Sequence, residues 1–523
     1  MIATLKDVTF TYPRGDSPAL SEVSLSVDDG SFSLLAGPSA GGKSTLLRLF
    51  NGLIPQFHGG TLRGKIEVGG HDPTRTPARQ MAGIAGMVFQ EPEAQAIAET
   101  VEDDIAFTLE QHGVAPAEMH RRVDRLLATV GIEHLRHRRL ATLSGGERQR
   151  SAIAAVLALE PRLLLLDEPT SQLDPGGAAA VIEAIERLHA ERGITVLLAE
   201  HRLERLLPVV DGVIEVEGGL VRQMTPREGA RQLRAVPAVS ELGRRLRLEP
   251  LPLTVDEALA SLNNLDLTVQ VREAGGAPGD ELLVVSGLTV AYGEHVALRN
   301  CSLSLREGEI VALVGANGSG KSTLFRAIAG LIRPVAGEVR TRGEVASSSV
   351  GRRTAVIGLV PQDPAIALYH ETVGAEVEAT LRVRGAGARS PSTLQAWGLT
   401  HVTERNPRDL SVGQQQRVAI AAMLAHEPPV WMLDEPTRGA DAAAKAWLAE
   451  RLRAHAARGG AAIVATHDME SAAQYATRAV GLENGEVVFD LPARTAFGTD
   501  GPLATQTARC VPGAITPGEV SRR

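Results

Sequence analysis

The chain has few aromatic and sulfur-containing residues and no long apolar run. Aromatic residues make up 3% of its 523 residues, and there are two cysteines, Cys301 and Cys510. Two thiols are too few for an iron–sulfur centre or a disulfide framework, so a reducing, cytoplasmic compartment is expected. No stretch of about 18 apolar residues occurs, which excludes a membrane-spanning helix and leaves any membrane role to a partner.

The chain also lacks an excess of positive charge. Its net charge is −8 and it has no long basic block, which argues against a protein whose main role is to bind nucleic acid. Hydrophobic residues make up 44% of the sequence. With so few aromatic residues, the core must be built from Ala, Leu, Val and Ile, as in α/β layers.

What the chain does contain is an internal repeat. The segment that begins at Ala19 recurs at Ala297, and Lys43 recurs at Lys321, each with an offset of 278 residues (297 − 19; 321 − 43). Both copies show a strand pattern, a turn, an apolar strand, a glycine-rich loop and a helix. The repeat therefore predicts two domains of one kind.

The later part of each copy keeps its spacing without change. Ser144 precedes Asp167 by 23 residues, and Ser411 precedes Asp434 by the same number. Insertions are tolerated in surface loops and resisted where geometry matters. The turn, helix, strand and acid of this block are therefore predicted to be the rigid part of each domain.

The glycine-rich loops match the P-loop pattern. Their glycines allow backbone N–H groups to surround phosphates, because a Cβ would block the approach. Lys43 and Lys321 are expected to reach the β- and γ-phosphates, and the serine after each lysine to ligate Mg²⁺. The predicted nucleotide-binding residues are Gly37, Pro38, Ser39, Ala40, Gly41, Gly42, Lys43, Ser44, Thr45, Gly315, Ala316, Asn317, Gly318, Ser319, Gly320, Lys321, Ser322 and Thr323.

Each copy also has an acidic pair, Asp167-Glu168 or Asp434-Glu435, directly after a short apolar run. The run 163–166 is typical of a buried parallel strand, and open α/β sheets bind ligands at the carboxyl ends of such strands. The two aspartates, with the serines that follow the P-loop lysines, are predicted to hold Mg²⁺. The two glutamates are predicted to polarise the attacking water. The alternative for each glutamate is a surface carboxylate at a strand end.

Four further side chains follow apolar strand patterns, namely Gln90, Gln362, His201 and His467. A glutamine amide at this place can contact Mg²⁺ or the water, although either glutamine taken alone is more often an ordinary loop residue. A histidine there can orient the γ-phosphate. The histidines lie 34 and 33 residues beyond their aspartates, and this agreement favours a catalytic role over a packing role.

Two more features of each copy are candidates for nucleotide contact. Tyr12 and Tyr292 precede the P-loops by 25 and 23 residues, and their rings can stack on adenine or pack in the core. A small-residue turn opens the helix before each acidic strand, so its backbone N–H groups and the helix dipole can face an anion. The predicted anion-facing residues are Ser144, Gly146, Ser411 and Gly413.

Taken together, these residues resemble the ATP-binding cassette (ABC) ATPases. LSGGERQR at 143–150 resembles the signature of that family, LLLLDEPT and VWMLDEPT its Walker B strands, and SQLD at 171–174 its D-loop. A finer resemblance points to the fused two-cassette ATPases of energy-coupling factor importers, which take up vitamins and metal ions. The segments that carry this finer resemblance are 51–60, 88–95, 199–204 and 359–373.

The resemblance implies an α/β fold of two P-loop NTPase ABC nucleotide-binding domains in tandem. Each would have a mixed sheet core, an antiparallel β subdomain and a helical subdomain. It further implies that MgATP is hydrolysed at two composite, head-to-tail sites. The signature turn at 144–146 would face the ATP held by Lys321, and the turn at 411–413 would face the ATP held by Lys43.

The implied function is that of an ATP-hydrolysing motor subunit at the cytoplasmic face of the cell membrane. Segments 90–98 and 362–370 would dock on an integral membrane subunit, which would carry a small solute such as a vitamin or metal ion. No nucleic acid partner is expected, and two cassettes in one chain remove the need for a homodimer. Two alternatives remain open: the tandem ATPase of a sugar importer, and a translation factor that acts on the ribosome. The second would call for a long basic linker.

The second copy departs from the family pattern at two places. Val412 stands where the signature usually has glycine, and RGAD at 438–441 replaces the usual Ser-x-Leu-Asp. Both departures would lie opposite the first P-loop. The resulting hypothesis is that the Lys43 site hydrolyses ATP more slowly than the Lys321 site.

The repeat and the local composition suggest where the domains end. The first ABC ATPase domain is expected at 1–224 and the second at 281–495. Segment 225–280 is expected to be a linker with some structure, including a helical pattern around 254–262. The tail at 496–523 has little periodicity and is expected to be poorly ordered.

Overall fold

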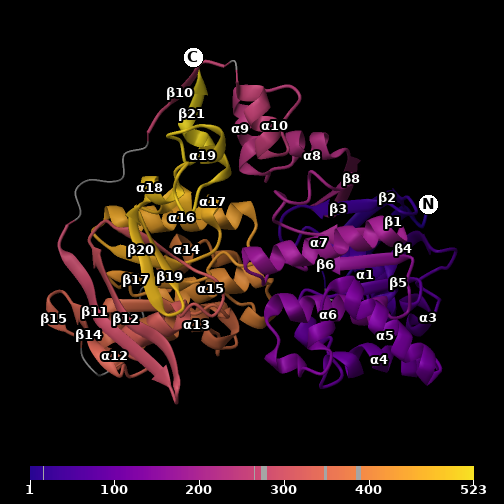
Figure 1. Cartoon of the computed structure of the whole chain (residues 1–523), viewed down its shortest axis with the longest axis horizontal. Coiled ribbons are helices and arrows are strands. Elements are labelled where there is room, and N and C mark those ends of the chain that lie inside the picture. Colours follow the sequence, from indigo (N-terminus) through magenta and orange to yellow (C-terminus); the bar gives the residue numbers. More distant parts are fainter. Residues whose placement is uncertain (14, 16, 264, 272–278, 347–349, 384–389) are drawn as a thin grey trace. The chain divides into compact units, whose positions relative to one another are not determined.

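The chain divides into two units, and the boundary lies in the segment between the repeats. The structure, a computed structural model, describes residues 1–13, 15, 17–263, 265–271, 279–346, 350–383 and 390–523. Residues 1–240 and 250–254 form the first unit, and residues 241–249 and 255–523 form the second (Figure 1). Across the described residues, none of the helices combines the length and apolar character needed to cross a bilayer.

The first unit is built around a six-stranded sheet in which all strands but the last run parallel. All five side chains of β6, for example, are buried, as expected for a strand that is covered on both faces. Leu164 and Leu166 pack against helices on one face, while Leu163 and Leu165 face a second core on the other. The strand order is β5 (Ala85–Val88), β6 (Leu163–Asp167), β7 (Thr195–Ala199), β3 (Phe32–Ala36), β8 (Gly212–Glu217) and β9 (Leu220–Met224).

A three-stranded antiparallel sheet covers that second core together with α1. Its buried and exposed residues alternate because one face packs on the core and the other is exposed to solvent. The strands lie in the order β2 (Leu20–Val27), β1 (Ala3–Thr11) and β4 (Thr61–Val68). The helices of the unit are α1 (Lys43–Phe50), α2 (Leu53–Gln56), α3 (Ala78–Ala82), α4 (Val101–Gln111), α5 (Pro116–Val130), α6 (Gly145–Leu157), α7 (Pro175–Arg192) and α8 (Pro226–Gln232), and α9 (Ala238–Leu246) follows.

The second unit repeats both sheets. Its central sheet has the order β16 (Ile357–Val360), β17 (Val430–Asp434), β18 (Ala461–Ala465), β13 (Ile310–Val314), β19 (Arg478–Glu483) and β20 (Glu486–Pro492). The antiparallel sheet has the order β12 (His295–Arg306), β11 (Glu281–Tyr292), β14 (Ala336–Thr341) and β15 (Glu344–Val345). The sheets and helices together confirm the predicted tandem α/β fold.

The helices of the second unit repeat the order seen in the first unit as far as the last strands of the sheet. They are α10 (Val255–Leu262), α11 (Lys321–Ile328), α12 (Val350–Val356), α13 (Val373–Val383), α14 (Ser390–Ala396), α15 (Val412–Leu424), α16 (Ala442–Ala457), α17 (Met469–Tyr475), α18 (Ala493–Phe497) and α19 (Gln506–Cys510). Helices α13, α14 and α15 correspond to α4, α5 and α6 of the first unit.

The C-terminal tail is folded, contrary to the expectation from its composition. Its last strand, β21 (Val520–Arg522), pairs antiparallel with β10 (Leu267–Val269) from the segment between the repeats (Figure 1). The Glu519 side chain is buried and pairs with Arg494. The tail lacks periodicity because its elements are short and are held by side-chain caps and long-range pairing rather than by an amphipathic stripe.

The segment between the repeats is folded as well. Helix α8 packs on β8 within the first unit, whereas α10 contacts α19 within the second. The observed α10 lies where the helical pattern around 254–262 predicts a helix. Residues 272–278 of this segment lie outside the described residues.

Candidate active site

The P-loop of the first unit lies between β3 and α1 and leaves no room for side chains at its first glycine. At Gly37 the backbone φ is 143°, and a Cβ would lie 2.1 Å from the carbonyl oxygen of Val216. Lys43 is 5% exposed, and its Nζ donates to the carbonyl oxygens of Gly37 (3.0 Å) and Pro38 (2.9 Å). Helix α1 begins without a side-chain cap, as is suitable for a helix N-terminus that binds phosphate.

The P-loop of the second unit, between β13 and α11, has the same geometry. A Cβ on Gly315 would lie 2.2 Å from the carbonyl oxygen of Leu482. The Nζ of Lys321 donates to the carbonyl oxygens of Gly315 (2.7 Å) and Ala316 (3.1 Å). In both units the lysine is therefore held over its own loop, with its charge close to the backbone that would surround a phosphate.

An oxygen pair that suits Mg²⁺ lies at the carboxyl end of β6. The hydroxyl of Ser44 donates to Asp167 Oδ1 at 2.9 Å, and burial raises the pKa of Asp167. In the second unit burial likewise raises the pKa of Asp434, which is hydrogen-bonded to Ser322. Hydroxyl and carboxylate oxygens are ligands that Mg²⁺ prefers. A bound cation would stabilise the charged form of each aspartate.

The described residues contain no group of three or more His, Cys, Asp or Glu side chains that could hold a metal ion. Mg²⁺ typically binds one or two protein oxygens and takes its remaining ligands from water and substrate phosphates. The Ser44–Asp167 pair fits that mode, in which the nucleotide completes the coordination.

Glu168 is the meeting point of two loops in the first unit. Its Oε2 accepts a hydrogen bond from Gln90 Nε2 at 2.9 Å, and its Oε1 lies 3.0 Å from His201 Nε2. The same His201 nitrogen is 3.5 Å from Lys43 Nζ. The structure thus brings together four residues that the sequence analysis singled out from separate motifs.

The second unit forms the same acid–imidazole pair through the other ring nitrogen. His467 Nδ1 lies 2.8 Å from Glu435 Oε1, and both side chains are almost fully buried. Gln362 follows β16 as Gln90 follows β5. The two sites therefore contain the same types of residue but differ in the orientation of the imidazole.

The two glutamates that are predicted to be catalytic share an uncommon backbone conformation. Glu168 has a φ of 50° and Glu435 a φ of 48°, in the left-handed region that residues with a Cβ rarely adopt. The N–H of Glu168 donates to Ala199 O, and that of Glu435 to Ala465 O, each at 2.9 Å. Each carboxylate is thus directed by a strained turn that is anchored to the neighbouring strand.

The tyrosines predicted to stack on adenine differ between the units. The ring of Tyr12 makes an edge contact with Phe10, with centroids 4.8 Å apart, and its hydroxyl is 3.1 Å from Thr45 Oγ1. These contacts agree with the packing alternative. Tyr292 is 48% exposed, so its ring is accessible to a base. Adenine stacking remains a prediction for both.

The signature turns open long helices in both units. Ser144 caps α6 and Ser411 caps α15, and each hydroxyl accepts from the backbone N–H three residues later in a capping box. A Cβ on Gly146 would lie 3.2 Å from Gly177 Cα, whereas one on Gly413 would meet nothing within 4 Å. Contact of these turns with the nucleotide of the other unit remains a prediction.

One buried residue of the site is absent from the sequence-based candidates. Glu200 is 2% exposed and lies between β7 and His201. Its carboxylate accepts hydrogen bonds from Thr170, His201 and Arg202. The available signal was an acidic residue directly after the apolar run 196–199, where a charge is costly unless it is paired.

The fold and the two sites define a P-loop ATPase with tandem cassettes. A family model described as "ABC transporter" matches residues 20–171 and 298–438. The chain belongs to the ABC transporter family and hydrolyses ATP. A Streptomyces avermitilis protein named as an ABC transporter ATP-binding protein is 41% identical over 93% of both chains.

Two other similarities extend over almost the whole chain. A Bacillus subtilis protein, named as the HMP/thiamine import ATP-binding protein YkoD, is 32% identical and is covered over 91% of its length, against 94% of this chain. The archaeal ABCE1 structure from a ribosome-bound complex with Pelota is 22% identical, with a TM-score of 0.65 over 93% of this chain and 79% of that one. The second similarity shows the fold alone.

Proposed function

We propose that this chain is the ATP-hydrolysing subunit of an energy-coupling factor type importer, at the cytoplasmic face of the membrane. In this proposal a membrane partner takes up a small solute such as a vitamin or metal ion. The importer name of the Bacillus subtilis relative supports this direction of transport. The observation that carries the proposal is a cavity beside segment 90–98.

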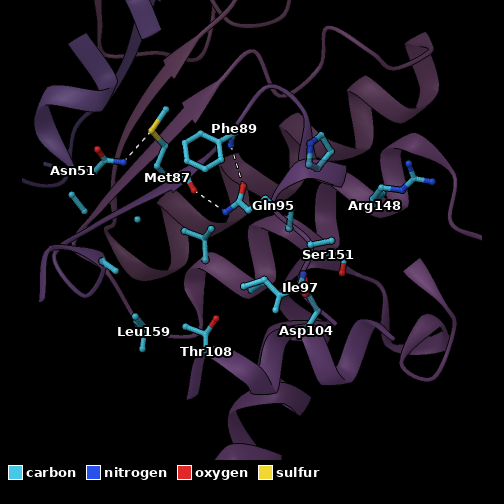
Figure 2. A pocket seen from close by; sticks show the side chains of 18 of the residues that line it. Asn51, Met87, Phe89, Gln95, Ile97, Asp104, Thr108, Arg148, Ser151 and Leu159 are labelled. Carbon is cyan, nitrogen blue, oxygen red and sulfur yellow. Dashed lines mark hydrogen bonds between the residues drawn. The ribbon is translucent and has the colours of Figure 1, made fainter. Parts of the chain in front are cut away.

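This cavity has a volume of about 280 Å³ and is lined mainly by apolar side chains (Figure 2). Gln95 fixes the backbone of two residues that line the cavity. Its Nε2 donates to Met87 O (3.0 Å) and its Oε1 accepts from Phe89 N (3.2 Å). Asp104 accepts from the backbone N–H groups of residues 97 (2.8 Å) and 98 (3.1 Å). The rim is thereby fixed while the side chain of Ile97 remains 67% exposed. A preformed apolar hollow with an exposed rim suits a helix of a partner protein.

Arg148 links the cavity to the signature helix. It lies on α6, its guanidinium pairs with Glu93, and it also donates to Leu143 O at 3.0 Å. A partner that presses on segment 90–98 would therefore act on both Gln90, which contacts Glu168, and the helix that Ser144 caps. This supports coupling between docking and hydrolysis.

The second unit exposes apolar side chains in the corresponding segment. Ile366 is 57% exposed and Tyr369 is 73% exposed. Glu376 Oε2 accepts from the N–H groups of Tyr369 (2.8 Å) and His370 (2.7 Å), as Asp104 does in the first unit. Segment 362–370 is therefore proposed as the second docking segment.

The catalytic roles follow from the contacts. Lys43 and Lys321 would bind the β- and γ-phosphates, and Ser44, Asp167, Ser322 and Asp434 would hold Mg²⁺, with Gln90 and Gln362 beside it. Mg²⁺ supplies charge neutralisation of the phosphates when it is bound. Glu168 and Glu435 would accept a proton from the attacking water, and His201 and His467 would orient that glutamate and the γ-phosphate.

Purification from detergent-solubilised membranes tests the proposal. A tagged chain is expected to bring down an integral membrane protein, whereas an Ile97→Asp, Ile366→Asp double variant recovers at least about tenfold less of it. A Leu220→Asp variant is the matched control, because Leu220 is also exposed (62%) but lies on β9. Recovery of ribosomal proteins instead would support the translation-factor alternative, and a bound sugar on the membrane partner would support the sugar-importer alternative.

A further inference from the structure

Glu200 connects two loops of the first active site. Its Oε1 accepts from the backbone N–H of Thr170 at 2.9 Å and from the hydroxyl of the same residue. Its Oε2 accepts from the N–H groups of His201 (2.9 Å) and Arg202 (3.4 Å). A carboxylate that is 2% exposed is tolerated only when donors surround it, and here both oxygens are used, one on each loop.

These contacts connect Glu200 on both sides to Glu168, through Thr170 and through His201. Thr170 follows Glu168 by two residues, and His201 directly follows Glu200. The imidazole of His201 then returns to Glu168 Oε1 at 3.0 Å. The hydrogen bonds of the Glu200 carboxylate go to these two loops. It acts by holding the two loops that place Glu168 and His201.

The second unit lacks this arrangement, although it keeps the acid–imidazole pair. Thr466 precedes His467 as Glu200 precedes His201, and its hydroxyl accepts from Asp468 N at 3.0 Å. A hydroxyl has one oxygen where a carboxylate has two, and the acceptor bond of Thr466 stays within its own loop, whereas Glu200 accepts with one oxygen from each of two loops. The loop after His467 is tied instead to helix α16, through the Lys445–Asp468 ion pair (2.7 Å).

We propose that Glu200 is a positioning residue that locks His201 and the turn after Glu168 into one arrangement, and that hydrolysis in the first site depends on this lock. The second site reaches its geometry without a carboxylate at this position. The inference rests on the ATPase activity of the family and is independent of the transported solute.

Steady-state ATPase kinetics in a Glu435→Gln chain test this proposal, because Glu435 is the proposed general base of the second site and its substitution is expected to silence that site. In this background Glu200→Thr, which introduces the residue of the second site, is expected to lower kcat at least about tenfold. The KM for MgATP should stay within about twofold, because the Glu200 carboxylate is buried and both of its oxygens are bonded to the two loops. The kcat of Glu200→Gln should lie between that of the Glu435→Gln background and that of Glu200→Thr. The glutamine amide keeps one acceptor oxygen, but its NH₂ group faces donors that need an acceptor. Single turnovers with limiting MgATP in the wild-type chain provide the same comparison if the steady-state rate is too low.

Thr170→Ala is the second variant, and it removes only one donor to Glu200. It is expected to lower kcat by a smaller factor, and the Glu200→Thr, Thr170→Ala double variant should lose no more than Glu200→Thr alone. Additive losses would show that the two residues do not act as a unit and would overturn the proposal. The proposal would also be overturned if the kcat of Glu200→Thr stayed within about twofold of that of the Glu435→Gln chain. A rise in KM at unchanged kcat would overturn it too.

Glu519→Gln is the matched control for loss of a buried carboxylate. Glu519 is 6% exposed and accepts from the N–H groups of Ile515 (2.7 Å) and Thr516 (3.3 Å) at the C-terminal end of the chain. The Glu519→Gln substitution should lower the melting temperature, as Glu200→Gln does, but should leave kcat unchanged. An equal loss of kcat in this control would assign the effect of Glu200 to general stability and would overturn the proposal.

Discussion

Gln90 and Glu168 are joined by a hydrogen bond of 2.9 Å, from Gln90 Nε2 to Glu168 Oε2. Gln90 begins the segment that lines the cavity beside Ile97, and Glu168 is the proposed general base. The bond therefore connects a surface suited to a partner with the place where water would be activated. A displacement of segment 90–98 would change the orientation of the carboxylate directly.

Removal of this bond should slow hydrolysis without preventing nucleotide binding. For Gln90→Ala we expect kcat to fall by about tenfold, since a positioned general base contributes about 10²–10⁴-fold and the bond provides only part of its positioning. The KM for MgATP should change less. ATPase assays over a range of MgATP concentrations measure both. An unchanged kcat would contradict a role for Gln90 in orienting Glu168.

The two active sites should not contribute equally. The Lys43 site is predicted to face the signature turn that contains Val412, so it is expected to be the slower one. Glu435→Gln should therefore lower total ATPase activity by a larger factor than Glu168→Gln does. Phosphate release measured at saturating MgATP makes the comparison. Equal losses would contradict the predicted asymmetry.

His455 should make the second unit sensitive to acid. Its ring stacks on Trp431 with centroids 3.8 Å apart, and burial lowers its pKa from 6.5 to about 4. Between these values the unfolded chain binds a proton that the folded chain excludes. The stability is therefore complete above pH 6.5 and is lost as the pH falls toward 4, by at most about 3 kcal/mol.

Urea unfolding of the full chain at several pH values, followed by tryptophan fluorescence, measures this loss. All three tryptophans lie in the second unit, so the signal reports that unit. His455→Phe keeps a ring against Trp431 and removes the titration, so its stability should depend less on pH between 6.5 and 4. The same pH dependence in the variant would show that other groups cause it.

The C-terminal tail should contribute to stability. Glu519→Ala removes the carboxylate that pairs with Arg494 and that accepts from two backbone N–H groups. We expect the free energy of unfolding of the second unit to fall by about 2–3 kcal/mol, as for other buried donors left without a partner. Thermal unfolding followed by circular dichroism measures the change. A Glu294→Ala variant, at an exposed carboxylate of the same unit, is the control and should change stability much less.

Local pattern was sufficient to predict the fold and most of the candidate site residues. A glycine-rich loop after an apolar strand, or an acidic pair at a strand end, involves residues that are adjacent in the chain. The physics of such a motif is therefore visible in a short window. The repeat then placed the second set of residues without any knowledge of packing.

The sequence by itself determined which residues are predicted to carry the chemistry, and the tertiary structure decided which of them meet. Ser44 reaches Asp167, and Gln90 reaches Glu168, because the strand order of the sheet places β5, β6 and β3 with their carboxyl ends at one edge. The order of strands in a sheet depends on contacts between segments far apart in the chain, and no local window contains it.

The same reason explains the two differences between expectation and structure. The tail at 496–523 is folded because β21 pairs with β10, about 250 residues earlier in the chain. Glu200 is held by Thr170, which is 30 residues away. Only the packed structure shows that its carboxylate is buried with every oxygen engaged, and that it supports the turn of Glu168.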